Sequence, residues 1–226
     1  MAESISSFDQ VADTYDDQLK TALGAFGDES EYFARYKVEL VSRTLRGSTV
    51  GTILDYGSGI GASIPYFKVF FPSAQILATD LSSESLKRLT TEHPDVNAVL
   101  PSDLKGHQFD LVFVSCVVHH MPVDSRFAEI GKLSELVRPG GHICVFEHNP
   151  FNPLTRRIVS KCEFDEGVVL VSRRRLRRLF TTQHESLDLR SGYCMFFPPA
   201  LKWFTFLDRF IRWLPLGGQH FLLGRK

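Results

Sequence analysis

The residue pattern with the clearest chemical meaning is an acid followed by three alternating glycines, Asp55-Tyr56-Gly57-Ser58-Gly59-Ile60-Gly61. A short apolar run at residues 52–54 precedes the pattern, and apolar residues at helical spacing follow it. Glycine adopts positive φ at little cost and lets a ligand lie against the backbone. The first N–H groups of the following helix also lack partners within that helix. The order of strand, glycine turn and helix predicts the opening unit of a nucleotide-binding domain.

Two classes of cosubstrate fit this loop. Gly57-x-Gly59-x-x-Ala62 satisfies the alanine-ended fingerprint of dinucleotide-binding proteins. An acid two residues before the first glycine, Asp55, favours a cationic amino-acid ligand over a pyrophosphate. A second acid, Asp80, ends the next predicted strand about 20 residues after the loop, where a carboxylate accepts the ribose hydroxyls of either ligand. The competing interpretation of Asp80 is a helix N-cap, a role for which Ser82 and Ser83 also qualify.

Three histidines lie where predicted strands end. His119 and His120 follow the strand at 109–115, and His148 follows the strand at 142–147. Imidazole titrates near neutral pH, so these side chains are candidate general bases for an acceptor hydroxyl. We expect His120 to be the base, with His148 as the alternative, and His119 to bond the backbone or cap a helix. These histidines and Glu147 could converge on a metal ion, but their spacing is not diagnostic, and we expect no metal site.

The elements that must position these residues alternate between strand and helix. The pattern predicts helices at 31–45, 61–71, 124–137 and 172–181, an aromatic helix at 198–214, and strands at 52–54, 75–80, 95–100, 109–115, 142–147, 186–197 and 219–223. The strand at 109–115 is apolar enough to be buried on both faces. Alternation of this kind predicts an α/β protein with a mostly parallel sheet.

Together these motifs resemble those of class I S-adenosylmethionine (SAM) methyltransferases of the ubiquinone/menaquinone type. The resemblance covers residues 8–147 and rests on the acid-glycine loop, the paired histidines after a strand, and Pro139-Gly140-Gly141 before the next strand. It implies a Rossmann-like class I methyltransferase fold, with a seven-stranded, mostly parallel sheet and an antiparallel last strand. Ser7 to Asp16 resembles the Phe-Asp-x-x-Ala-x-x-Tyr-Asp opening of that family. An N-terminal helical lid at residues 1–48 and a core at residues 49–226 are therefore expected.

The resemblance also implies the cosubstrate, SAM, which leaves as S-adenosyl-L-homocysteine. The residues expected to hold it are Asp55, Gly57, Ser58, Gly59, Gly61, Asp80, Leu81, Asp103, Ser115 and Tyr15. Asp103 matches the acid that the family places at the adenine amino group. However, only five residues separate it from Phe109, where the family usually has a longer loop.

The predicted function is transfer of a methyl group from SAM to a small-molecule, glycan or lipid-linked acceptor, at a hydroxyl oxygen. C- or N-methylation of a quinone or lipid precursor is one alternative. A non-catalytic module that binds SAM or NAD is another. The strand at 109–115 is not followed by the Asn/Asp-Pro-Pro-aromatic motif of amino-methylating DNA enzymes, and no recognised nucleic-acid-binding module is present.

Charge is distributed unevenly along the chain. Residues 1–150 carry 12 basic and 20 acidic side chains and residues 151–226 carry 14 and 6, so the two parts have net charges of −8 and +8. The second part includes aromatic and basic elements at 150–216, with an arginine cluster at 173–178 and an aromatic segment at 196–214. These two stretches predict peripheral contact with a membrane surface or a lipid-linked substrate. A homodimer that covers the aromatic segment is the alternative.

The remaining features favour a cytoplasmic protein, with peripheral association at the inner membrane face as the membrane hypothesis implies. The first ten residues are polar and acidic, unlike a signal peptide. No apolar run approaches the roughly 20 residues that span a bilayer. The four cysteines show no CxxC pair or metal-ligand spacing, and Cys116 and Cys144, which lie in apolar strand-like runs, are expected to be buried free thiols.

Overall fold

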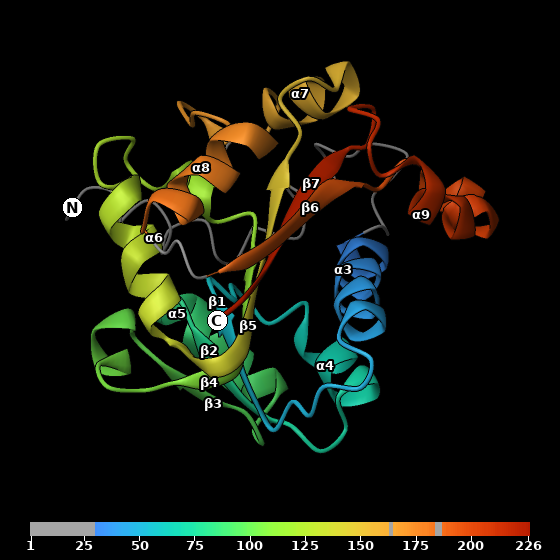
Figure 1. The fold of residues 1–226 in the computed structure, drawn as a ribbon. Helices are drawn as coiled ribbons and strands as arrows, with labels where there is room; N and C mark the ends of the chain where they lie inside the picture. Colours follow the sequence, from blue (N-terminus) through green and yellow to red (C-terminus); the bar gives the residue numbers. More distant parts are fainter. Residues whose placement is uncertain (1–29, 163–164, 184–186) are drawn as a thin grey trace.

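The computed structural model describes residues 30–162, 165–183 and 187–226, and one sheet runs through them (Figure 1). Its seven strands, in spatial order, are β3 (Asn97–Val99), β2 (Gln75–Thr79), β1 (Thr52–Tyr56), β4 (Phe109–Ser115), β5 (Val137–His148), β7 (Gln219–Arg225) and β6 (Asp188–Cys194). Neighbouring strands from β3 to β5 are parallel, and β7 is antiparallel to both β5 and β6. The predicted fold is confirmed.

Helices cover both faces of the sheet. α3 (Ser30–Thr44) and α4 (Ile64–Phe70) lie on one side, and α6 (Arg126–Glu135) and α8 (Arg173–Gln183) lie on the other (Figure 1). α5 (Ser83–Glu92) contributes Leu89 to the core on the α3–α4 side. The shorter described elements are η2 (Pro101–Leu104), η3 (Val118–His120), α7 (Pro153–Val159), η5 (Pro199–Leu207) and α9 (Asp208–Ile211).

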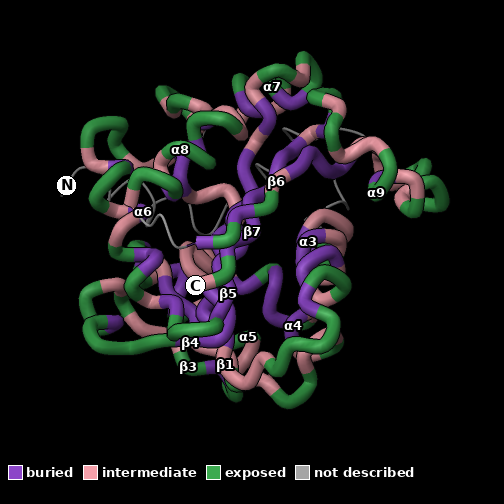
Figure 2. The backbone as a smooth tube through the Cα atoms, viewed as in Figure 1, coloured by how far each residue is buried: buried purple, intermediate pink, exposed green. Residues whose placement is uncertain are grey.

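The core is divided by the sheet into two layers, which Figure 2 shows as buried backbone along the strands. Successive strand residues point to opposite faces, so Ile53 packs toward α3 and α4 while Leu54 packs toward α6 and α8. β4 is buried at every position except Ser115, as its apolar sequence predicts. Because β1, β2, β4 and β5 are parallel, their carboxyl ends lie at one edge of the sheet. The glycine loop, Asp80 and the three histidines all lie at or just beyond these strand ends.

The helix predicted at 124–137 is shorter than expected. α6 ends at Glu135, and Val137 instead begins β5, where it pairs with Phe109. An irregularity between Phe109 and Leu111 lets the pairing continue past the turn at Gly140, whose φ is +78°. Val137 lies four residues after Leu133, so its side chain fits a helical pattern, but pairing with β4 overrides the local periodicity.

The aromatic helix predicted at 198–214 is also wrong in form. The segment is a 3₁₀ stretch, η5, followed by the single α-helical turn of α9, and the backbone at Leu201 is non-helical. No side chain of η5 is buried. Most helices in proteins are stabilised by packing one apolar stripe, and this segment has apolar residues on all sides and no such packing to hold one long helix.

Asn149 and Asn152 stabilise the connection after β5. Asn149 is fully buried, and its Nδ2 donates to the carbonyls of Pro215 and Gly217 at 3.0 and 2.8 Å. Asn152 caps α7, a helix the sequence pattern did not predict, through a hydrogen bond from the Thr155 N–H to Oδ1 at 3.0 Å. The paired Asn-Pro motifs thus join the end of β5 to the turn before β7.

Two further sequence predictions concern the N-terminal lid and membrane-spanning segments. The lid motif at residues 7–16, with Tyr15, lies outside the described residues. Within the described ranges, none of the helices has both the length and the apolar character needed to cross a membrane.

Candidate active site

The glycine loop leaves β1 and turns through three positive φ angles, at Gly57 (+72°), Gly59 (+52°) and Gly61 (+92°). A Cβ at Gly57 would overlap Val117, and one at Gly61 would lie 3.0 Å from Leu89. These two glycines are therefore required by packing inside the protein. A Cβ at Gly59 would meet no atom of the described residues within 4 Å, so this is the position where a ligand can approach the backbone.

Two buried oxygens of this loop, Asp55 Oδ2 and Ser58 Oγ, have no hydrogen-bond partner in the part of the chain that the structure describes. Burial, reinforced by the negative charge of Asp80, raises the pKa of Asp55 to about 7, and Lys37 opposes this rise. An unsatisfied buried carboxylate is costly in the ligand-free protein. A ligand with a cationic amino group would supply the missing partner, so these residues fit the amino-acid end of SAM.

Asp80 supports the loop from the end of β2. Its Oδ2 accepts the Gly59 N–H at 2.8 Å and its Oδ1 accepts the Ser82 N–H at 2.9 Å. The side chain that caps α5 is Ser82, whose Oγ accepts the Ser85 N–H. Asp80 thus holds the loop from which Gly59 faces open space. A carboxylate oxygen can accept more than one hydrogen bond, so this role is compatible with the expected contact to a ribose hydroxyl.

The other expected SAM-binding residues that the structure describes differ in exposure and in their hydrogen-bond partners. Leu81, directly after Asp80, is 54% exposed. Ser115 ends β4, and its Oγ accepts a hydrogen bond from Lys37 Nζ at 2.6 Å. Asp103 is exposed in η2 and accepts a hydrogen bond from the Ser102 hydroxyl. The assignment of Asp103 to adenine stays a prediction.

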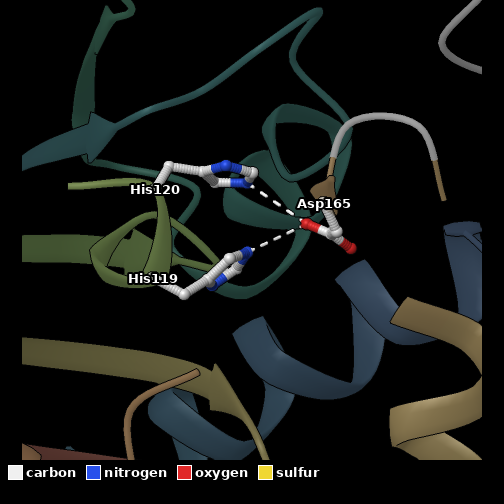
Figure 3. A group of neighbouring side chains, drawn as sticks. All are labelled: His119, His120 and Asp165. Carbon is white, nitrogen blue, oxygen red and sulfur yellow. Dashed lines mark hydrogen bonds and ion pairs between the residues drawn. The ribbon is translucent and has the colours of Figure 1, made fainter. Parts of the chain in front are cut away.

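A second cluster lies at the ends of β4 and β5, around His119 (Figure 3). His119 Nδ1 lies 2.6 Å from Glu147 Oε2, and His119 Nε2 lies 3.2 Å from Asp165 Oδ1. His120 Nε2 lies 3.4 Å from the same oxygen of Asp165. The ring centroids of His119 and His148 are 5.2 Å apart. The structure therefore brings all three predicted histidines together.

The charges in this cluster shift one another. The pKa of His119 is raised to about 10: burial alone would lower it, but Glu147 and Asp165 outweigh burial. The pKa of Glu147 is lowered to about 2, because His119 outweighs the burial that would raise it. The pKa of His120 is lowered to about 4 by burial and by the neighbouring charge of His119. His119 is thus engaged on both nitrogens, while His120 is a neutral imidazole at pH 7.

Three residues of the site carried no recognised sequence signal. Lys37 is buried on the inner face of α3, and Asp165 lies far along the chain from its histidine partners. Cys116 follows β4 with a positive φ of 58° and accepts a hydrogen bond from Gln219 Nε2 at 3.2 Å. Burial would raise the pKa of the Cys116 thiol, but Lys37 and His148 lower it to about 6. A lysine at an apolar helix position could have been noticed; the other two could not.

Part of the chain matches a known family of protein domains. The family model described as a methyltransferase domain matches residues 54–143, which run from β1 through the glycine loop and the histidine pair into β5. This stretch therefore matches a methyltransferase domain, and the sheet that contains it has the class I methyltransferase fold. The predicted recognition is confirmed at the level of domain and fold. A search of curated proteins finds no match.

Solved structures share the fold at low sequence identity. A SAM-dependent methyltransferase from Archaeoglobus fulgidus is 14% identical, with a TM-score of 0.61 over 84% of this chain and 94% of its own. An O-methyltransferase family protein from Burkholderia thailandensis is 15% identical, with a TM-score of 0.65; the match covers 89% of this chain and 58% of that protein. The DhpI-SAM-HEP complex is 18% identical, with a TM-score of 0.63 over 100% and 98%. At these identities the similarity concerns the fold of the methyltransferase domain.

Proposed function

We propose that this methyltransferase domain transfers a methyl group from SAM to a hydroxyl oxygen of a small-molecule, glycan or lipid-linked acceptor. The observation that carries the proposal is the pair of buried, unpartnered oxygens, Asp55 Oδ2 and Ser58 Oγ, beside the open side of Gly59. Leaving a buried polar atom unpaired costs about 1–3 kcal/mol, and SAM would supply the partners. The DhpI-SAM-HEP complex and the O-methyltransferase family structure, which share the fold, support the same donor and acceptor class.

The chemistry divides between the cosubstrate and the chain. SAM supplies a methyl group on a sulfonium sulfur, which is already a good leaving group. The chain must hold the acceptor oxygen in line with that methyl and remove the hydroxyl proton. The loop at β1 and the histidine cluster at β4 and β5 lie at the same edge of the sheet, as these two tasks require.

Two histidines are candidates for the proton acceptor. His119 is not one of them, because both of its nitrogens face carboxylates. The His120 side chain is 23% exposed and its lowered pKa leaves it neutral at pH 7, so it can take a proton. His148 is half-buried, with its ring centroid 5.2 Å from that of His119, and is the alternative.

Binding of S-adenosyl-L-homocysteine tests the site, with two glycines that the structure matches. Gly59→Ala and Gly106→Ala both place a Cβ at positive φ in open space, so each carries a similar strain of about 1–2 kcal/mol. Only the Cβ at Gly59 occupies the path of the ligand. We expect calorimetry to show at least a tenfold loss of affinity in Gly59→Ala and wild-type affinity in Gly106→Ala. Equal affinities in the two variants, or binding of NADH by the wild type, would contradict the proposal.

Substitution of the two histidines tests proton removal. His120→Ala or His148→Ala, whichever removes the base, should lower methyl transfer roughly 10²–10⁴-fold, because the acceptor hydroxyl would keep its proton. Affinity for S-adenosyl-L-homocysteine should change little. Transfer of labelled methyl from SAM into a lipid and metabolite extract measures both variants. Full activity in both would indicate an acceptor that needs no base, such as a carbon or nitrogen nucleophile.

We further propose that the acceptor is reached at an anionic membrane surface. The aromatic surface, which we define as Leu201, Trp203, Phe204, Phe206, Phe210 and Trp213, is exposed throughout, and Trp203 is 78% exposed. Basic side chains lie among these rings: Lys202 Nζ is 5.8 Å from the Trp203 ring and the Arg209 guanidinium is 4.6 Å from the Phe210 ring. Mixed aromatic and basic groups favour the headgroup boundary of anionic lipid.

The arginine helix α8 contributes less to this proposal than its composition suggests. Leu176 and Phe180 of α8 are buried against the sheet, and Arg177 donates to the Leu189 carbonyl at 2.8 Å. Figure 1 places α8 and α9 on opposite sides of the β6–β7 pair. The two stretches therefore do not form one face, and the aromatic surface alone carries the membrane proposal.

A further inference from the structure

Two histidines and one carboxylate converge on a small space at the end of β4. His119 Nε2 and His120 Nε2 lie 3.2 and 3.4 Å from the same oxygen, Asp165 Oδ1 (Figure 3). The candidate ligand atoms of these three residues all lie within 4.8 Å of one another. The histidines come from η3 and the carboxylate from a separate segment, so the fold, not local sequence, assembles the group.

We propose that His119, His120 and Asp165 bind one divalent transition-metal ion of the Zn²⁺ type. Two imidazoles and one carboxylate are a ligand set typical of zinc and of other first-row ions that favour imidazole. Ligand atoms about 2.0–2.2 Å from Zn²⁺ lie roughly 3.4 Å apart in a tetrahedral arrangement. The separations at Asp165 already match this value, and all three candidate ligand atoms lie within 4.8 Å of one another.

The hydrogen bonds around His119 prepare it to bind a cation. Glu147, fully buried, accepts from His119 Nδ1 with Oε2 and from the Val118 N–H with Oε1 at 2.7 Å. With Nδ1 donating to Glu147, His119 would bind the ion through Nε2, and the ion would displace the proton that this nitrogen shares with Asp165 in the ion-free protein. A carboxylate behind a ligating histidine is the usual support of protein metal sites. Once that proton has left, the two carboxylates of Glu147 and Asp165 carry two negative charges beside the imidazoles, which a divalent ion balances.

Arg126 holds the two ligand-bearing segments together. Its side chain is fully buried, and NH2 donates to the His119 carbonyl and to the Val169 carbonyl, each at 2.8 Å. Nε donates to the Met121 carbonyl at 2.9 Å. This one side chain therefore joins the backbone of the histidine segment to the segment that follows Asp165, and it does so without the ion.

A three-residue site leaves at least one coordination position for another ligand. His120 is partly exposed, so this position is open to the acceptor rather than sealed in the core. If the proposed function holds, the ion would bind the acceptor oxygen and lower its pKa, and His148 would then take the proton. Binding of the ion itself does not depend on methyl transfer.

Metal binding by the full chain, purified without a histidine tag, tests the site. After dialysis against a chelator, titration with Zn²⁺, and with Co²⁺ followed by its visible absorbance, should show one ion per chain. Asp165→Asn removes a ligand and should weaken binding at least 100-fold. Glu147→Gln should weaken it roughly 10–100-fold. His107→Ala, which removes an exposed histidine beside Phe109, is the matched control and should bind like the wild type.

The same variants separate this inference from the proposed function. Affinity for S-adenosyl-L-homocysteine should be retained in Asp165→Asn, because the glycine loop is untouched. Wild-type protein that binds neither Zn²⁺ nor Co²⁺ at micromolar concentrations would overturn the inference, and so would equal binding by Asp165→Asn and His107→Ala. Either result would mean that the cluster holds a proton shared between His119, Glu147 and Asp165 and not a metal ion. This conclusion would not depend on whether the cosubstrate binds.

Discussion

The buried acidic residues of this site differ in whether a positively charged side chain is paired with them. Glu147 and His119 stabilise each other, so the pKa of each moves toward its charged form. Asp55 has no such partner, and burial raises its pKa to about 7. The two buried acids therefore differ in role. Glu147 is paired with a histidine of the protein itself, whereas Asp55 would be paired by the amino group of a bound ligand.

The raised pKa of Asp55 predicts how affinity depends on pH. Below pH 7 the ligand-free carboxyl keeps its proton, and an ammonium group binds the ionised form more tightly. Affinity for S-adenosyl-L-homocysteine should therefore rise roughly tenfold from pH 6 to pH 8, with most of the rise below pH 7. Calorimetry across this range measures it. Asp55→Asn should bind weakly with little pH dependence, and a wild-type affinity independent of pH would argue against this role.

The raised pKa of Asp55 also makes the stability of the ligand-free protein depend on pH. Because the folded pKa of Asp55 lies above its ordinary value, ligand-free protein loses stability as pH rises from about 4 to about 7. Ligand-free Asp55→Asn lacks this loss. Its midpoint of thermal unfolding should exceed that of the wild type at pH 8 and approach it at pH 4, which serves as the internal control.

How far the sequence predicts the site depends on whether its parts are local. Asp55, the three glycines and Asp80 lie on consecutive elements with strong patterns, so they could be predicted. The role of Asp165 could not, because it comes from the packing of a distant segment that Arg126 holds in place. The thiol of Cys116 likewise depends on Lys37, which reaches it from α3.

At the scale of elements, the predictions succeed where periodicity and packing agree. β4 and α8 have the predicted positions because their apolar residues match the faces they bury. The helix end at Val137 was wrong because strand pairing decided it. The aromatic segment was wrong because no partner surface within the described chain selects one helical stripe.

The cap of α7 gives a prediction at this scale. Asn152→Ala removes the bond from the Thr155 N–H and the bond from Nδ2 to the Leu216 carbonyl at 2.7 Å. Loss of such a cap costs about 0.5–2 kcal/mol, so the midpoint of thermal unfolding should fall by roughly 1–8 °C. Ser160→Ala, at the exposed other end of α7, should unfold within about 1 °C of the wild type. A matching fall in both would mean that the cap is not responsible.

For the whole molecule, the two faces of the sheet have different surroundings. The side that carries α3 also carries α9, through a hydrogen bond between the Tyr36 hydroxyl and Asp208. The other side carries α6 and α8. The positive charge of the second part of the chain is thus divided, and the aromatic surface lies on the side that carries α3.

Flotation with vesicles tests what covers the aromatic surface. Vesicles rich in anionic lipid should bind the wild-type protein at low salt and release it as salt rises, because basic side chains lie among the rings. Trp203→Ser with Phe206→Ser should abolish binding. Arg174→Gln with Arg178→Gln, on the far side, should change it little. A protein that stays unbound at low salt and sediments as a dimer would replace the membrane with a second copy of the chain.

Cys116 gives the site a consequence that concerns oxidation. With a pKa of about 6, most of its thiol is thiolate at neutral pH, whereas burial raises the pKa of the Cys144 and Cys194 thiols. Thiolates are the forms that peroxide converts to sulfenic acid, reversibly at first. Oxygen added to this sulfur would disturb the contacts with Lys37 and Gln219 beside the reaction site. The redox history of a sample, and not only its concentration, should therefore determine how much active protein it contains.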